Sequence, residues 1–216
     1  EASVYAEQLL RDGAIGRIVQ VMGWGPHRLS ASTRPSWFFD REKYGGILVD
    51  LGCHQIEQLV FFAGAHTATI TQSRTGNYAH TQYPTFEDFG DATLVCDNGV
   101  TGYFRVDWFT PDGLGAWGDG RTLVIGTKGY LELRKYIDVA NSAEGDHIYY
   151  VNDEGEFHVC ASGKCGFPFF GRLIRDCIDR TETAMTQEYV FHIMTLSLDA
   201  QEYAERVGFE DIDHAE

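Results

Sequence analysis

The spacing of hydrophobic positions changes several times along the chain, and each change predicts a different element. Apolar residues recur with helical spacing over 3–12, 47–63, 168–179 and 187–206. Short β-branched stretches alternate with polar residues once after the first helix and repeatedly between the second helix and the third. The stretches expected to form strands are 16–24, 67–75, 91–96, 100–109, 121–125, 130–134, 147–151 and 157–160. This order predicts an α+β fold with a large, mostly antiparallel open sheet and helices packed on one face.

Turn residues separate the expected strands and fix where the last helix begins and ends. Asn98-Gly99 is typical of a type I′ hairpin, and Lys128-Gly129 marks another tight turn. Thr186 is the expected N-cap of the last helix, and Gly208 follows its end. We therefore expect the whole chain, residues 1–216, to form one domain.

The helix expected over 47–63 has two different faces. Leu48, Ile56 and Leu59 fall on one side of a helical wheel, and Asp50 and His54 fall on the other. An aspartate one turn before a histidine can orient the imidazole for proton transfer. A solvated helix face is the alternative interpretation of this spacing. The helix is apolar nearly all round, however, so we expect its second face to meet a domain, a subunit or a ligand cleft.

The polar segment 25–44 precedes this helix and is long for a loop inside a compact domain, which favours a functional role. It contains Arg34, Trp37 and Lys43, the residue types that bind a polyol and an anion. Two glycines at 45–46 would let a ligand approach the backbone closely. Within the same segment, His27 is expected to fix the loop by a hydrogen bond rather than to reach a substrate.

A second loop, 110–120, is flanked by Trp108 and Arg121, which we include among the expected substrate-binding residues. A structural or interface role for both residues stays equally open. The loop contains the pattern G-x-G-x-x-G at 113–118, but a strand and not a helix is expected after it. A dinucleotide site needs a helix N-terminus at that point, so the pattern predicts an ordinary loop and no cofactor-binding residues here.

Composition narrows the function classes. Apolar residues make up 44% of 216 residues, as in ordinary globular proteins, and the formal net charge is −15. Such an acidic surface disfavours nucleic acid and anionic membranes as partners. An odd number of cysteines, five, favours free thiols in a reducing, cytoplasmic compartment. Neither the cysteines nor the histidines have the spacing of a metal site. Because the first residue is Glu1, the chain is expected to be a fragment or a processed product.

At the expected helix, the sequence resembles a known family. The segment Y-G-G-I-L-V-D-L-G-C-H-Q-I-E, residues 44–57, looks like the G-G-x-L-x-D-x-G-x-H-x-I-D signature of the glucose–fructose oxidoreductase and inositol dehydrogenase family. The G-x-I-G pattern at 13–16, the Glu87-Asp88 pair and the closing helix are also similar to the second domain of that family. Glu57 stands where the family often has Asp.

The resemblance implies the second domain of a two-domain oxidoreductase that uses NAD or NADP. The cofactor would be bound mainly by an N-terminal Rossmann domain, which these residues do not include. His54 would be the general acid/base toward a hydroxyl of a sugar-like substrate, and Asp50 would orient His54 or bind the substrate. The family also implies that the open sheet assembles a homo-oligomer. The aromatic alternation of strand 100–109, which turns either Tyr103 or Phe104 outward, supports the same expectation.

The leading hypothesis is therefore the substrate-binding and catalytic-wall domain of an NAD(P)-dependent oxidoreductase acting on a sugar, a polyol or a related hydroxyl or carbonyl compound. By itself, this chain is expected to be inactive. The alternative hypothesis is a carbohydrate-binding or subunit-assembly module that keeps the fold without the chemistry. The presence of both Asp50 and His54 favours the enzyme.

Overall fold

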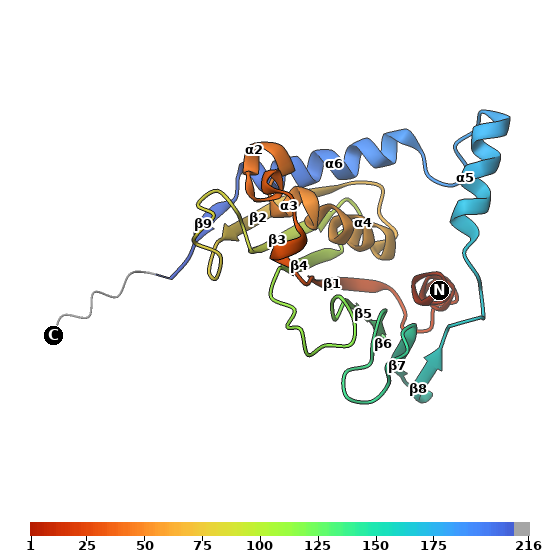
Figure 1. Ribbon diagram of the computed structural model, residues 1–216. Helices are drawn as coiled ribbons and strands as arrows, with labels where there is room; N and C mark the ends of the chain where they lie inside the picture. Colours follow the sequence, from red (N-terminus) through yellow and green to blue (C-terminus); the bar gives the residue numbers. More distant parts are fainter. Residues whose placement is uncertain (210–216) are drawn as a thin grey trace.

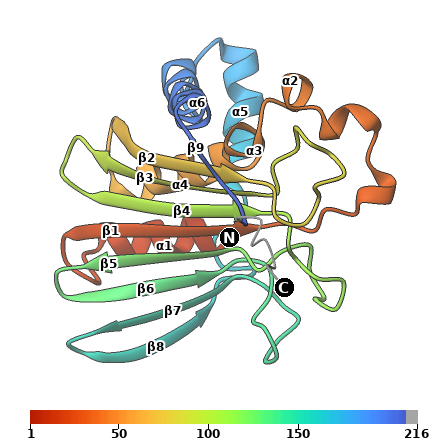
Figure 2. The ribbon, with the colours of Figure 1, turned by 90° about the vertical axis from the view of Figure 1, so that its left-hand side faces the viewer.

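The computed structural model describes residues 1–209, in which nine strands form one sheet of order β8-β7-β6-β5-β1-β4-β3-β2-β9 (Figures 1 and 2). The strands are β1 (Ile18–Pro26), β2 (Ala68–Gly76), β3 (Phe89–Cys96), β4 (Thr101–Asp107), β5 (Arg121–Gly126), β6 (Gly129–Arg134), β7 (His147–Asn152), β8 (Gly155–Cys160) and β9 (Glu205–Val207). The helices are α1 (Ala2–Arg11), α2 (Arg41–Tyr44), α3 (Ile47–Asp50), α4 (Gly52–Ala63), α5 (Pro168–Asp179) and α6 (Gln187–Glu202). The structure also contains two short 3₁₀ helices, η1 (Ala31–Thr33) and η2 (Ser36–Phe39).

Strand β1 lies at the centre of the sheet and joins two antiparallel meanders. On one side it pairs in parallel with β4, which continues antiparallel to β3 and β2. On the other side it pairs antiparallel with β5, which continues through β6 and β7 to β8. The predicted α+β class and mostly antiparallel sheet are confirmed. The two parallel pairings, β1 with β4 and β2 with β9, join strands far apart in sequence and leave no local pattern.

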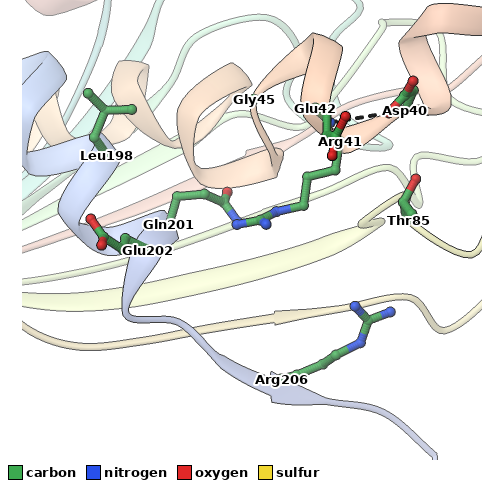
Figure 3. Close-up of a pocket in the computed structure, with 9 residues that line it drawn as sticks. All are labelled: Asp40, Arg41, Glu42, Gly45, Thr85, Leu198, Gln201, Glu202 and Arg206. Carbon is green, nitrogen blue, oxygen red and sulfur yellow. Dashed lines mark hydrogen bonds between the residues drawn. The ribbon is translucent and has the colours of Figure 1, made fainter.

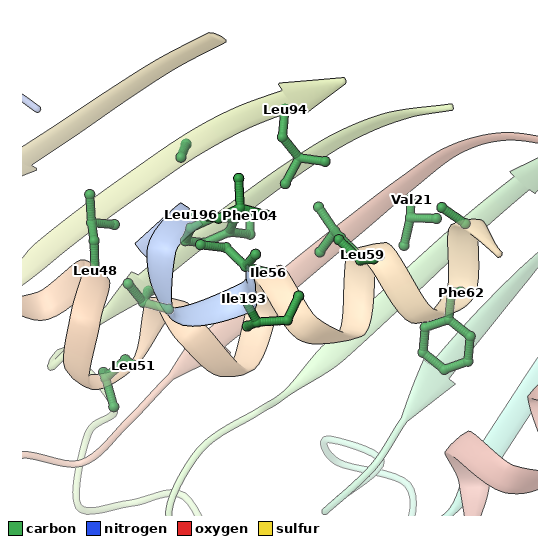
Figure 4. Close-up of a cluster of buried hydrophobic side chains, with 14 of the residues drawn as sticks. Val21, Leu48, Leu51, Ile56, Leu59, Phe62, Leu94, Phe104, Ile193 and Leu196 are labelled. Atoms are coloured by element: carbon green, nitrogen blue, oxygen red, sulfur yellow. The ribbon is translucent and has the colours of Figure 1, made fainter. Parts of the chain in front are cut away.

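Helices α1, α3, α4 and α6 cover one face of the sheet, and the core lies between the two layers (Figures 1 and 4). Ile56 and Leu59 of α4 point at the sheet, as the helical wheel predicts, and both are fully buried. Two glycines of the sheet make room for Leu59. A Cβ at Gly102 would lie 2.5 Å from its Cδ2, and one at Gly23 would lie 3.2 Å from its Cδ1. The helix therefore packs close to β1 and β4.

Three sequence expectations need correction. The segment 25–44 is not a plain loop, because it contains η1, η2 and α2. The single helix expected over 47–63 is divided at Leu51 into α3 and α4, beside Gly52, a weak helix former that packs against Phe104. The last helix ends at Glu202, short of the expected 206, and the next residues form β9 on the sheet edge. A three-residue polar strand has too little pattern to be recognised in a sequence.

The opposite face of the sheet is not covered by the described helices. Tyr103 lies on this open face, whereas its neighbour Phe104 is fully buried under α4, which settles the register left open by the sequence. Trp24 and Tyr130 are also exposed, at 40% and 47%. The same face also carries ion pairs, among them Arg74 of β2 with Asp91 of β3 at 2.6 Å. The open face is thus a mixed aromatic and charged surface.

Helix α5 stands apart from α4 and α6 and is joined to the body by extended segments (Figure 1). Asp176 is its one buried residue. Phe170, Ile174 and Ile178, spaced four residues apart, are 63–74% exposed. Within residues 1–209, no helix has the length and hydropathy needed to cross a membrane.

Candidate functional site

Asp50 and His54 lie on either side of the junction between α3 and α4. Asp50 is the last residue of α3 and is half-buried, and His54 is exposed in the first turn of α4. Within residues 1–209 no hydrogen bond joins the two side chains. Burial raises the pKa of Asp50, and the nearby charges of Arg34 and His54 oppose that rise. The two predicted residues therefore share one site, with the histidine open to a ligand.

The start of α3 is fixed by a buried polar network. Gln201 of α6 accepts a hydrogen bond from the backbone N–H of Leu48 at 2.9 Å, and Glu87 accepts one from that of Ile47 at 2.9 Å. Gln201 also donates to Glu87 at 3.0 Å. Gly46, at φ 99°, allows this arrangement, because a Cβ there would lie 2.3 Å from the Gln201 amide carbon. The second glycine of the pair is thus needed for packing against α6 and not, as the sequence suggested, for close approach of a ligand.

Arg34 lies beside this junction, at one end of an aromatic wall. The wall consists of the adjacent rings of Phe38, Trp108, His27, Trp117 and Tyr136. Its guanidinium carbon is 4.5 Å from the ring centroid of Phe38 and 5.3 Å from that of Trp108. Its Nε donates to the carbonyl oxygen of Leu29 at 3.0 Å. Trp108 is 5% exposed, and its indole N–H is buried without a hydrogen-bond partner within residues 1–209. The sequence-predicted residues Arg34 and Trp108 are therefore in contact.

His27 continues the wall. Its ring lies 5.5 Å from that of Trp108 and 4.3 Å from that of Trp117. Nδ1 donates to the carbonyl oxygen of Gly25 at 3.0 Å, which is the loop-fixing hydrogen bond expected from the sequence. Burial lowers the pKa of His27, and the charges of His54, Arg34 and Lys135 lower it further, against the effect of the Gly25 bond. The side chains of His54, Arg34 and Lys135 therefore all lie within electrostatic reach of the His27 imidazole.

Lys135, which the sequence analysis missed, completes the wall. Trp117 lies 4.4 Å from Tyr136, and the Lys135 ammonium lies 5.8 Å from the Tyr136 ring. The ammonium donates to the side-chain carbonyl of Gln58, whose amide donates to the backbone carbonyl of His54 at 2.9 Å. Burial lowers the pKa of Lys135 to about 8, opposed by the charge of Glu57. No local motif marks Lys135, because it reaches the site only through the strand order.

The other predicted site residues, Trp37, Lys43 and Arg121, form none of the contacts described above. Trp37 is 50% exposed on η2, with its ring 6.1 Å from that of Phe38. Lys43 is exposed on α2 and forms an ion pair with Asp40 at 2.9 Å.

The prediction that Arg121 belongs to the same site needs correction. Its strand turns it to the open face, where it pairs with Asp119 at 2.7 Å and lines a pocket of about 150 Å³ with Trp24 and Glu132. It does not join the cluster around His54.

A wide groove of about 770 Å³ lies elsewhere, between α2 and the end of α6 (Figure 3). Arg41, Thr85 and Arg206 line it, and none of the predicted site residues does. Within residues 1–209, no group of three or more His, Cys, Asp or Glu side chains is arranged to hold a metal ion.

Comparison with known proteins identifies the family and supports the fold. A family model described as the GFO/IDH/MocA C-terminal domain matches residues 4–132. The chain belongs to the GFO/IDH/MocA family. Among solved structures, a protein of Erwinia carotovora atroseptica, provisionally named an oxidoreductase, is 48% identical with a TM-score of 0.92, covering 95% of this chain and 61% of that protein. None of the curated proteins matches the chain.

Two more distant members show the same fold. A 3-ketoreductase from Actinomadura kijaniata, solved with NADP and TDP-benzene, is 15% identical with a TM-score of 0.68, covering 96% of this chain and 60% of that one. A myo-inositol 2-dehydrogenase from Lactobacillus plantarum is 21% identical with a TM-score of 0.66, covering 94% and 59%. The chain thus spans about six-tenths of the length of these GFO/IDH/MocA proteins.

Proposed function

We propose that this GFO/IDH/MocA domain provides the substrate wall and the acid/base residue of an NAD(P)-dependent oxidoreductase acting on a sugar, a polyol or a related hydroxyl or carbonyl compound. The observation that carries the proposal is the exposed His54 beside half-buried Asp50, next to a wall of aromatic and cationic side chains. Aromatic faces stack on sugar rings, and histidine is the side chain that most often serves as a general acid or base.

His54 carries the proton in this proposal. Its imidazole takes the proton of a substrate hydroxyl during oxidation and returns it to the carbonyl oxygen during reduction. Asp50 stabilises the protonated ring by its charge, and Arg34, which lies over the rings of Phe38 and buried Trp108, contacts the substrate. Trp37 and Lys43 form the outer part of that surface.

Loop 113–118 does not fit the binding of a dinucleotide. Loop 113–118 is followed by strand β5, and Arg28 donates to the carbonyl oxygens of Leu114 and Ala116 at 2.6 and 3.0 Å. Gly118 lies against β1, since a Cβ there would be 1.9 Å from the carbonyl oxygen of Pro26. Position 118 therefore requires glycine because of this packing, and not to let a phosphate approach the backbone. We place NAD or NADP on a Rossmann domain outside these residues. The ketoreductase was solved with NADP, which supports the choice of a nicotinamide cofactor.

Two surfaces fit the partners that this function needs. The exposed stripe of Phe170, Ile174 and Ile178 on α5 provides an apolar surface for the cofactor domain. The open sheet face, with Trp24 and Tyr130, provides one for a second copy of the chain.

The test of the proposed function is His54→Asn in the full-length protein. We expect kcat to fall by about 10²- to 10⁴-fold, the usual contribution of a general acid/base, with cofactor affinity unchanged. Asp50→Asn should cost less, because Asp50 acts through His54. Both variants should keep the fold, since this face lies away from the core. Turnover of His54→Asn within about threefold of the wild type, small against that loss, would favour the assembly module.

The oligomer has a separate test. Sedimentation of the 216-residue chain at micromolar concentration should show self-association, and Trp24→Glu should reduce it by placing a charge in the interface. Lys128→Glu, a substitution at an exposed turn, is the matched control. A monomeric wild type would contradict the proposed interface without affecting the role of His54.

A further inference from the structure

Arg34 differs from every other half-buried arginine within residues 1–209. Five of the six such arginines pair with a carboxylate of the protein at 3.4 Å or less. These five are Arg28, Arg74, Arg105, Arg121 and Arg134. Arg34 forms no ion pair in the same part of the chain. A partly buried guanidinium without a counter-ion is unfavourable unless something else supplies the negative charge.

The guanidinium of Arg34 is held ready for such a charge. Contacts with the rings of Phe38 and Trp108, at 4.5 and 5.3 Å from their centroids, hold it in place, and its Nε donates to the carbonyl oxygen of Leu29. Its two terminal nitrogens have no hydrogen-bond acceptor within residues 1–209. A fixed, planar pair of N–H donors matches the two oxygens of a carboxylate.

The charges around Arg34 are of both signs. Lys135, at the other end of the same wall, donates to an uncharged amide and forms no ion pair in the described chain, although the charge of Glu57 acts on it. Asp50 is the carboxylate on which the charge of Arg34 acts, but it forms no ion pair with Arg34 within residues 1–209. An anionic ligand would therefore supply the direct partner that Arg34 lacks.

We infer that the substrate carries a carboxylate group, as in a sugar acid, and that Arg34 binds this carboxylate through its two terminal nitrogens. The inference rests on the proposed function, because it takes the wall beside His54 to be the substrate surface. It separates sugar acids from neutral sugars and polyols, a choice that the fold alone leaves open.

The experiment compares neutral and carboxylated compounds with the same ring in the full-length protein. Glucose is paired with glucuronate and galactose with galacturonate, each with NAD and NADP, and glucose 6-phosphate tests a phosphate in place of the carboxylate. We expect kcat/KM for the acid of at least one pair to exceed that of its neutral counterpart by about 10- to 100-fold, as for a charged hydrogen bond. Arg34→Gln should reduce this preference to below about threefold, mainly through KM.

Two variants serve as controls. Arg34→Lys keeps the charge without the fork and should retain part of the preference. Arg74→Gln removes a half-buried arginine on β2 that pairs with Asp91, and it should leave the preference unchanged. Thermal unfolding of each variant shows whether it is folded.

Several outcomes overturn the inference. A kcat/KM for the neutral sugar that equals or exceeds that for the acid in both pairs overturns the inference and leaves the proposed oxidoreductase function intact. Preference for glucose 6-phosphate over glucuronate overturns the carboxylate assignment. If no compound is turned over, calorimetry measures the binding of the two acids to the wild type and to Arg34→Gln instead. Binding of either acid that is lost in Arg34→Gln supports the inference while contradicting the proposed function, and absence of such binding overturns the inference.

Discussion

Helices α4 and α5 are both twelve residues long, and they are packed very differently. Seven residues of α4 are buried, and the helix lies on the sheet. In α5 only Asp176 is buried, while its apolar stripe is exposed. Both helices have the spacing of an amphipathic helix. Amphipathic spacing therefore predicts that one face of a helix is buried, but it does not show which surface covers that face.

The largest expected effect is on stability, and it separates the two helices directly. Leu59→Ala in α4 should lower the free energy of unfolding by about 2–5 kcal/mol, because it leaves a cavity against β1 and β4. Ile174→Ala in α5 of the same 216-residue chain should change it by less than about 0.5 kcal/mol. Urea denaturation measures both. Similar losses for the two variants would show that α5 packs on this chain after all.

A smaller effect tests what covers α5. Ile178→Ala should leave the stability of the 216-residue chain unchanged. In the full-length protein it should lower the stability by about 2 kcal/mol, at about 0.8 kcal/mol for each CH₂ group removed from a buried contact. Thr195→Ala, an exposed change on α6, is the control in both. Equal results for Ile178→Ala in the two proteins would exclude the cofactor domain as the cover of this stripe.

The smallest effect concerns how α5 is held at its end. Asp176 accepts hydrogen bonds from the Thr181 and Thr183 hydroxyls at 2.6 and 2.8 Å, and from the Ala184 N–H at 2.7 Å. These bonds hold the pKa of Asp176 well below its usual range. A lowered pKa in the folded state means that this stabilisation is present above about pH 4, the ordinary aspartate value, and is lost as the pH falls further.

Hydrogen exchange measures this local effect. Asp176→Asn should speed exchange of the amides after α5 at neutral pH and leave those of α4 unchanged. In the wild type, the same amides should lose protection below pH 4, before the core does. If the amides of α4 lost protection together with those of α5 in the variant, the two helices would form one cooperative unit.

Much of the fold was predictable from local signals. Alternation and turn pairs such as Asn98-Gly99 identified the strands, because hairpins join neighbours in sequence. The parallel pairing of β1 with β4 was not predictable, since it depends on tertiary packing. Nor did strand alternation alone show which side of β5 meets the helices. Arg121 is predicted at the site because it flanks loop 110–120, whereas in the structure it is Thr122 that faces α4.

The candidate site divides in the same way. Asp50 and His54 are four residues apart, so their spacing predicts them from the sequence even though the structure places them on two helices, α3 and α4. Arg34 and Trp108 were proposed from residue type, and the structure brings them into contact. Lys135 and Trp117 were missed, because each reaches the wall from a distant strand or loop with no motif of its own.

The central place of β1 has a consequence for the order of folding. Each meander beside it is built from hairpins, which close short loops and form quickly. The contacts of β1 span far more chain: Gln20 meets Thr101 at a separation of 81 residues, and Arg17 meets Thr127 at 110. Such long loops carry a larger entropic cost of closure. We therefore expect the first strand of the chain to be the last of the central strands to enter the sheet, uniting two halves that have already formed.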